Sequence, residues 1–86
     1  MKVRIPTPLR SYTTQAALVA AEGTTVAEVL VDLDLQFPGL RFRVVDEQGR
    51  LRPHMRVFVN EDLTRDLSTA VTDTDVMTLM QALSGG

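Results

Sequence analysis

The chain has 86 residues, of which 44% are apolar and 23% charged, and its net charge is −2. These values predict one small globular domain and argue against a disordered chain. The nine Lys and Arg residues are scattered, which argues against a nucleic-acid partner, and the lack of cysteine excludes disulfides, a thiolate nucleophile and a cysteine-rich zinc site. No apolar stretch is long enough for a signal peptide or a membrane span, so we expect a cytoplasmic protein with no membrane partner.

The chain opens with a predicted hairpin. Val3 and Ile5 alternate with charged residues, which is the period of a half-buried strand. Residues 10–15 are polar and predict a turn, and residues 16–21 supply a second short strand.

One amphipathic helix follows this hairpin. Thr25 and Glu28 match a capping box, which satisfies exposed amides at a helix start. Five apolar residues then recur at helical spacing and define one buried face: Val26, Val29, Leu30, Leu33 and Phe37. Pro38 and Gly39 end the helix.

The second half of the chain predicts further strands. Residues 40–51 suggest a crossing segment or a loose hairpin, and residues 55–59 alternate as a strand. Residues 63–67 form a short connection or a minimal edge strand. A polar turn over residues 72–75 leads into an apolar last strand over residues 76–83.

This order predicts an α+β fold in which a mixed sheet of four to five strands carries one main helix on one face. The last strand is apolar on both faces, which places it in the middle of the sheet. We expect Met77 and Leu79 to face the helix, together with Val3, Ile5, Val57 and Val59. The opposite face then carries exposed apolar side chains, which are typical of partner surfaces: Val76, Thr78 and Met80, joined by Phe58 and Leu63.

The sequence closes on Gly85 and Gly86, preceded by an apolar strand with no cap or charge. Glycine has no Cβ, so such a segment can pass through a slot too narrow for side chains. We therefore expect a domain over residues 1–81 and a flexible tail over residues 82–86 that delivers the Gly86 carboxylate to a partner. A terminus without a function is the other interpretation.

Three stretches carry a resemblance to a known family: VRIPTPLRSYT, VFVNEDLTRDL and TDTDVMTLMQALSGG. With the final glycines, they resemble the ubiquitin-like sulfur carriers of the MoaD/ThiS family, which share the β-grasp fold. The family includes the small subunit of molybdopterin synthase, the thiazole-pathway carrier and a carrier in an alternative cysteine synthesis. The opening stretch is most similar to these cysteine-biosynthesis carriers of the CysO type.

The resemblance implies a protein cosubstrate and not an enzyme. Its Gly86 carboxylate would be adenylated by an E1-like enzyme of the MoeB/ThiF type, using ATP and Mg²⁺ that this chain does not bind. A thiocarboxylate on Gly86 would then donate sulfur, with Gly85 providing flexibility. Pro6, Leu63 and Met80 would dock the activating enzyme, and we place Phe58 and Leu83 on the same partner surface.

Several functions are compatible with a tail of this kind. The sulfur could serve cysteine synthesis on a PLP-dependent cysteine synthase, formation of a specialised metabolite, or the molybdenum cofactor through a molybdopterin synthase small subunit. A JAMM-type metalloprotease that trims residues beyond the glycines is a further partner expected for the cysteine route. In a different class, the chain would be a ubiquitin-like modifier conjugated to proteins through Gly86.

Other polar groups predict local structure. Asp73 and Asp75 lack the remaining acids and the glycine of a calcium loop, so we interpret them as turn residues and expect no metal site. His54 follows a proline and is expected in a solvated loop. Glu61 and Asp62 form, with Asp66, a small acidic patch that either steers a partner or is simply solvated.

Overall fold

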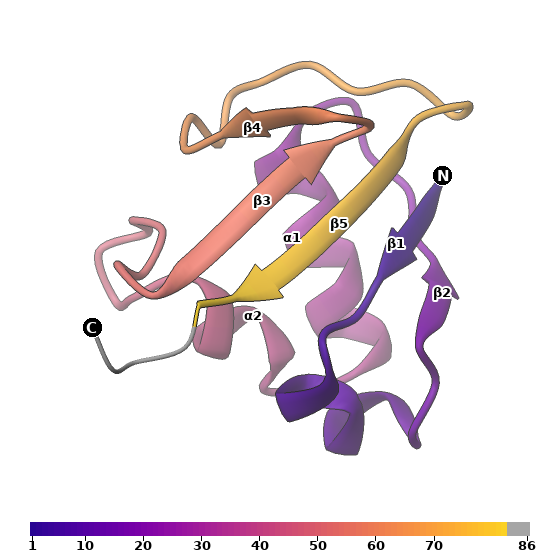
Figure 1. Cartoon of the computed structure of the whole chain (residues 1–86), viewed down its shortest axis with the longest axis vertical. Helices are drawn as coiled ribbons and strands as arrows, with labels where there is room; N and C mark the ends of the chain where they lie inside the picture. Colours follow the sequence, from indigo (N-terminus) through magenta and orange to yellow (C-terminus); the bar gives the residue numbers. More distant parts are fainter. Residues whose placement is uncertain (83–86) are drawn as a thin grey trace.

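The computed structural model describes residues 1–82 as a five-stranded mixed sheet with helices packed on one face (Figure 1). The strands are β1 (Lys2–Arg4), β2 (Leu18–Ala20), β3 (Met55–Val59), β4 (Asp62–Thr64) and β5 (Val76–Gln81). Their order is β2-β1-β5-β3-β4, with β1 and β5 parallel and the other neighbours antiparallel. The prediction that the last strand lies in the middle of the sheet is therefore confirmed.

The inner face of the sheet forms the core that the alternation predicted. The six predicted inward residues are at most 9% exposed: Val3, Ile5, Val57, Val59, Met77 and Leu79. Successive residues of a strand point to opposite faces, so their neighbours along the strands are turned to the outside. The short strand β4 corresponds to the minimal edge strand expected after residue 62.

Helix α1 (Val26–Gln36) covers this inner face and begins where the capping box predicted. The Thr25 hydroxyl accepts a hydrogen bond from the Glu28 amide at 3.2 Å, while the Glu28 carboxylate accepts from the amide and hydroxyl of Thr24, each at 2.9 Å. Gly23 comes just before this cap, and a Cβ there would lie 2.7 Å from the Val29 nitrogen. A residue with no side chain is therefore required where the chain turns into the helix.

The predicted turn over residues 10–15 is wrong in its extent, because a 3₁₀ helix, η1 (Thr7–Thr13), occupies most of it. Pro8 lies at the start of η1, where a missing N–H costs nothing. Thr14 and Gln15 then take left-handed backbone conformations that end the helix. The second strand is correspondingly shorter than the predicted residues 16–21.

A second helix, α2 (Leu40–Val44), occupies the first part of residues 40–51, where a crossing segment or loose hairpin was expected. The remaining residues do form a small hairpin, closed by an antiparallel bridge between Val45 and Leu51. Leu40 and Val44 lie four residues apart on one side of the helix, and both are fully buried. The Asp34 carboxylate accepts hydrogen bonds from the amides of Gly39 and Arg41 at 3.1 and 3.2 Å, which satisfies donors at the start of α2. Packing and this cap from α1 stabilise a helix too short to form alone.

Strand β5 ends earlier than predicted, at Gln81, and the next amide, of Ala82, donates to the His54 carbonyl at 2.7 Å. His54 itself is exposed, as expected for a residue in a solvated loop. Leu83, Gly85 and Gly86 lie outside the described residues. Within residues 1–82, no helix combines the length and apolar character needed to cross a bilayer.

Candidate functional site

The outer face of the sheet carries one row of side chains across all five strands. Paired residues of neighbouring strands form it in the order Leu18, Arg4, Thr78, Phe58 and Leu63. Leu18 and Leu63 at its two ends are 50% and 56% exposed. Nothing in the sequence singled out Leu18, because its exposure depends on β2 being an edge strand.

The structure brings the predicted partner residues together in two pairs. Phe58 and Leu63 are cross-strand neighbours on β3 and β4. Pro6 and Met80 line one hollow of about 520 Å³ beside the end of β5, and Met80 is 48% exposed. Met80 lies two residues beyond Thr78 on the same face, so the pairs form one continuous surface of four apolar residues. We call it the apolar face.

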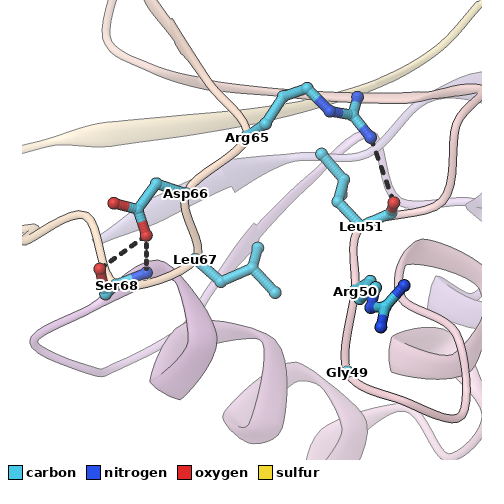
Figure 2. A pocket seen from close by; sticks show the side chains of 7 residues that line it. All are labelled: Gly49, Arg50, Leu51, Arg65, Asp66, Leu67 and Ser68. Carbon is cyan, nitrogen blue, oxygen red and sulfur yellow. Dashed lines mark hydrogen bonds between the residues drawn. The ribbon is translucent and has the colours of Figure 1, made fainter.

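A separate hollow of about 450 Å³ lies between the turn at residues 46–51 and the segment after β4 (Figure 2). There, Arg65 donates to the carbonyls of Leu51 and Met55 at 3.1 Å and to that of Arg52 at 3.4 Å. The Arg65 side chain is thus bonded within the chain and stabilises the loop before β3.

The acid next to Arg65 has a local role as well. The Asp66 carboxylate accepts from the hydroxyl and amide of Ser68, and these bonds lower the pKa of Asp66. Asp66 is therefore part of a turn that follows β4, whereas Glu61 and Asp62 lie just before and at the start of β4.

In the turn before β5, the hydrogen-bonded role that was predicted for two aspartates is confirmed for Asp75, whereas the Asp73 side chain makes no hydrogen bond within residues 1–82. The Asp75 carboxylate accepts from the Asn60 side-chain amide at 2.9 Å and from the Thr72 amide at 2.8 Å. Asn60 in turn accepts from the Val76 amide at 3.0 Å, so these bonds set where β5 begins. Across residues 1–82, no cluster of three His, Cys, Asp or Glu side chains suits a metal ion.

Replacing Asp75 with asparagine is expected to lower the free energy of unfolding at pH 7. The carboxylate offers one oxygen to each donor, whereas an amide offers one oxygen and places its NH₂ group against the other donor. Hydrogen bonds from Asn60 first, and then from Thr72, lower the pKa of Asp75, so the stability they provide is present at neutral pH and is lost as the pH falls through the folded-state pKa. The loss in the variant should therefore shrink below about pH 4.

Urea unfolding at pH 7 and in acid measures this effect. Asp73→Asn is the matched control, because the Asp73 side chain has no hydrogen bond within residues 1–82. A difference between Asp75→Asn and the parent that stays constant with pH would show that the charge of Asp75 is not involved.

The chain is similar to known carrier and modifier proteins over nearly its whole length. The ThiS family model matches residues 3–86. The sulfur carrier protein CysO of Mycobacterium tuberculosis is 35% identical, with 98% of this chain and 96% of that protein covered. A chain in the crystal structure of the Amycolatopsis orientalis BexX/CysO complex gives a TM-score of 0.92 at 35% identity, covering 99% of this chain and 98% of its own.

A third similar structure is that of a protein named as a modifier and not as a sulfur carrier. The crystal structure of SAMP1, a small archaeal modifier protein from Haloferax volcanii, gives a TM-score of 0.79 at 27% identity, covering 100% of this chain and 98% of its own. These structures confirm the predicted β-grasp fold, and the matches to CysO confirm the resemblance to carriers of that type. The chain belongs to the ThiS family.

Proposed function

We propose that the chain is a sulfur carrier whose Gly86 carboxylate is converted to a thiocarboxylate. The observation that carries this proposal is the family match, which runs to Gly86 and so includes both terminal glycines. The 35% identity to a sulfur carrier protein over almost both full lengths supports the same role. The chain then acts as a protein cosubstrate, and the chemistry is performed by its partners.

The carboxylate has to be activated because its leaving group would otherwise be oxide. In the proposed reaction, a Gly86 oxygen attacks the α-phosphorus of ATP, a new P–O bond forms and pyrophosphate leaves. Hydrosulfide then attacks the acyl carbon and AMP leaves with its electron pair. Loss of the S–H proton to solvent leaves a thiocarboxylate on Gly86. An E1-like adenylating enzyme of the MoeB/ThiF type would supply the ATP site and Mg²⁺, which stabilises the developing charge.

The apolar face is the proposed docking surface for this enzyme. Phe58, Leu63 and Met80 lie on one side of the sheet, and Pro6 shares the hollow beside Met80. Leu83, outside the described residues, is proposed as a further contact because it is only two residues after the end of β5 in the sequence. An apolar centre of this kind is typical of the core of a protein interface.

Incubation with the cognate adenylating enzyme, ATP, Mg²⁺ and sulfide tests the proposal by intact mass. We expect the mass of the chain to rise by the difference between sulfur and oxygen, and only when ATP is present. Peptide mass spectrometry should locate the added sulfur on Gly86. Transfer to a PLP-dependent cysteine synthase would then identify the cysteine route, and transfer to a molybdopterin synthase large subunit would identify the cofactor route. A chain that stays unmodified under these conditions contradicts the proposal.

Conjugation to proteins is the second candidate, and the similarity to SAMP1 supports it. Adenylation is the same in both cases, but a target lysine amine would attack the acyl carbon in place of sulfur. The amine would displace AMP and leave an isopeptide bond. Adducts of Gly86 with lysines in cell extracts, found by peptide mass spectrometry, would favour this candidate over the carrier role.

A further inference from the structure

Five arginines from separate parts of the chain surround the last residues of β5. Two line the hollow that contains Met80 and Gln81, two others line a second hollow that also contains Gln81, and the fifth is paired with Met80 across the sheet. Among the residues that the structure describes, no aspartate or glutamate lines either of these two hollows. We call this group the arginine collar, and its members in chain order are Arg4, Arg10, Arg43, Arg52 and Arg56.

Three of the five collar arginines are held by neutral groups. The Arg10 and Arg52 Nε atoms donate to the carbonyls of Ile5 and Phe42 at 3.0 and 2.8 Å, and the Arg52 guanidinium lies 4.8 Å from the centre of the Phe42 ring. Arg56 donates to the carbonyls of Pro53 and Met55 at 2.7 and 3.0 Å.

None of these bonds involves a carboxylate. Within residues 1–82, no collar arginine is hydrogen-bonded to an aspartate or glutamate. The charges of Arg10, Arg52 and Arg56 are therefore held in place by neutral groups, while the side chains of Arg4 and Arg43 have no hydrogen bond within the described residues. One carboxylate is near the collar: the pKa of Asp46 is lowered first by the hydrogen bond from the Arg50 amide and further by the charges of Arg50 and Arg52. The other four collar arginines remain available to a partner, and guanidinium groups favour recognition of carboxylates.

The opposite end of β5 is acidic. Glu61 lies in the β3–β4 turn and Asp62 is the first residue of β4; this turn is tied to the start of β5 by the bond between Asn60 and Asp75. The length of β5, about 17 Å at 3.3 Å per residue, separates this end from the collar. The charge of the described residues is thus polarised along β5, with the acidic side chains near its start and the collar near its end at Gln81.

We propose that the arginine collar docks onto an acidic protein surface surrounding the entrance through which the partner admits the tail. This inference rests on the proposed function and adds to it the charge of the partner. The collar borders the apolar residues Pro6 and Met80, and an apolar centre with a charged rim is the usual anatomy of a protein interface. Complementary charge raises the association rate and orients the encounter, so the polarised chain approaches with its tail end first.

A polyanion such as nucleic acid fits these observations less well. The chain has a net charge of −2 and an acidic end, so a uniformly negative partner would be repelled by much of the molecule. A partner with a localised acidic rim avoids this repulsion, because only the collar contacts it.

Charge reversal on two sides of the collar tests the proposal. Arg4→Glu and Arg43→Glu both change exposed side chains that have no hydrogen bond within the described residues, so the fold should tolerate them. Lys2→Glu is the matched control: it makes the same charge change on the same face of β1, about 7 Å farther from the tail. Association with the cognate adenylating enzyme is measured by stopped-flow without ATP, at low and at physiological salt.

We expect each arginine variant to slow association about tenfold at low salt and to weaken its salt dependence, and the lysine control to slow it much less. Unchanged thermal unfolding would show that the variants are folded. If the two arginine variants associate at the parental rate, or if Lys2→Glu slows association as much as they do, the proposal that the collar docks onto the partner is wrong. Tight binding of the parent to duplex DNA would overturn it as well.

Sulfur transfer distinguishes this failure from that of the proposed function. If the parent chain gains sulfur and Arg4→Glu and Arg43→Glu gain it equally fast at limiting enzyme, only the collar is wrong. If the parent neither binds the adenylating enzyme nor gains sulfur, the carrier role itself is wrong.

Discussion

Replacing Gly86 with alanine is expected to slow thiocarboxylate formation about a hundredfold, on the scale of misplacing a reacting group by roughly 1 Å. The reacting atom is the main-chain carboxyl carbon of this residue, and a Cβ would be attached directly beside it. The methyl group would crowd both the approach of the carboxylate to the α-phosphorus and the later approach of the sulfur donor.

The same substitution should leave the free energy of unfolding unchanged. Every residue of the described core lies between Val3 and Leu79, so alanine at position 86 alters none of these contacts. Urea unfolding measures stability, and intact mass over time measures sulfur gain at equal enzyme concentration.

Ser84→Ala serves as the control, because it changes the same tail without adding a Cβ at the reacting residue. It should gain sulfur at the parental rate. If Gly86→Ala also gains sulfur at that rate, the steric role of the terminal glycine is wrong, although the carrier role would stand.

Much of the fold was predictable because its signals are local and mutually consistent. The capping box at Thr25 and the apolar spacing after it correctly predicted where α1 begins and which face it buries. The apolar character of residues 76–81 on both faces correctly predicted that β5 has a neighbour on each side. Both features depend on a few adjacent residues, so the rest of the chain need not be known.

The misplaced elements depend instead on distant contacts. Helix α2 has only five residues, and the Asp34 carboxylate that satisfies its first amides belongs to α1. Its only local signal was the spacing of Leu40 and Val44, which is too short to distinguish a helix from a loop.

The arginine collar was not predictable for the same reason. Its members are spread from residue 4 to residue 56, and in the sequence they are part of a scattered set of basic residues. The parallel pairing of β1 with β5, together with the positions of η1, α2 and the loop before β3, brings them to one end of the sheet.

Substitutions at two adjacent residues of β5 are expected to have different effects: one should lower stability and the other should weaken partner binding. Leu79 points into the core and is 1% exposed, so Leu79→Ala should lower the free energy of unfolding by about 2–5 kcal/mol, the usual cost of such a cavity. Met80 points outwards and is 48% exposed, so Met80→Ala should lower it by no more than about 0.5 kcal/mol.

For binding to the adenylating enzyme, Met80→Ala should have a larger effect than Leu79→Ala, which is the reverse of their effects on stability. Met80→Ala removes the apolar side chain at the centre of the proposed docking surface, beside both Pro6 and the arginine collar, and should weaken binding to the adenylating enzyme about tenfold, or 1.4 kcal/mol. Under conditions where it is folded, Leu79→Ala should bind at close to the parental affinity. Titration calorimetry and urea unfolding on the same samples provide both quantities.

The helical side of the molecule provides the decisive control. Leu35 on α1 is 78% exposed and lies on the layer opposite the apolar face, so Leu35→Ala removes an exposed leucine without altering that face. It should bind as the parent does. Weaker binding by Leu35→Ala together with parental binding by Met80→Ala would place the partner on the helices, and neither the apolar face nor the arginine collar could then be the docking surface.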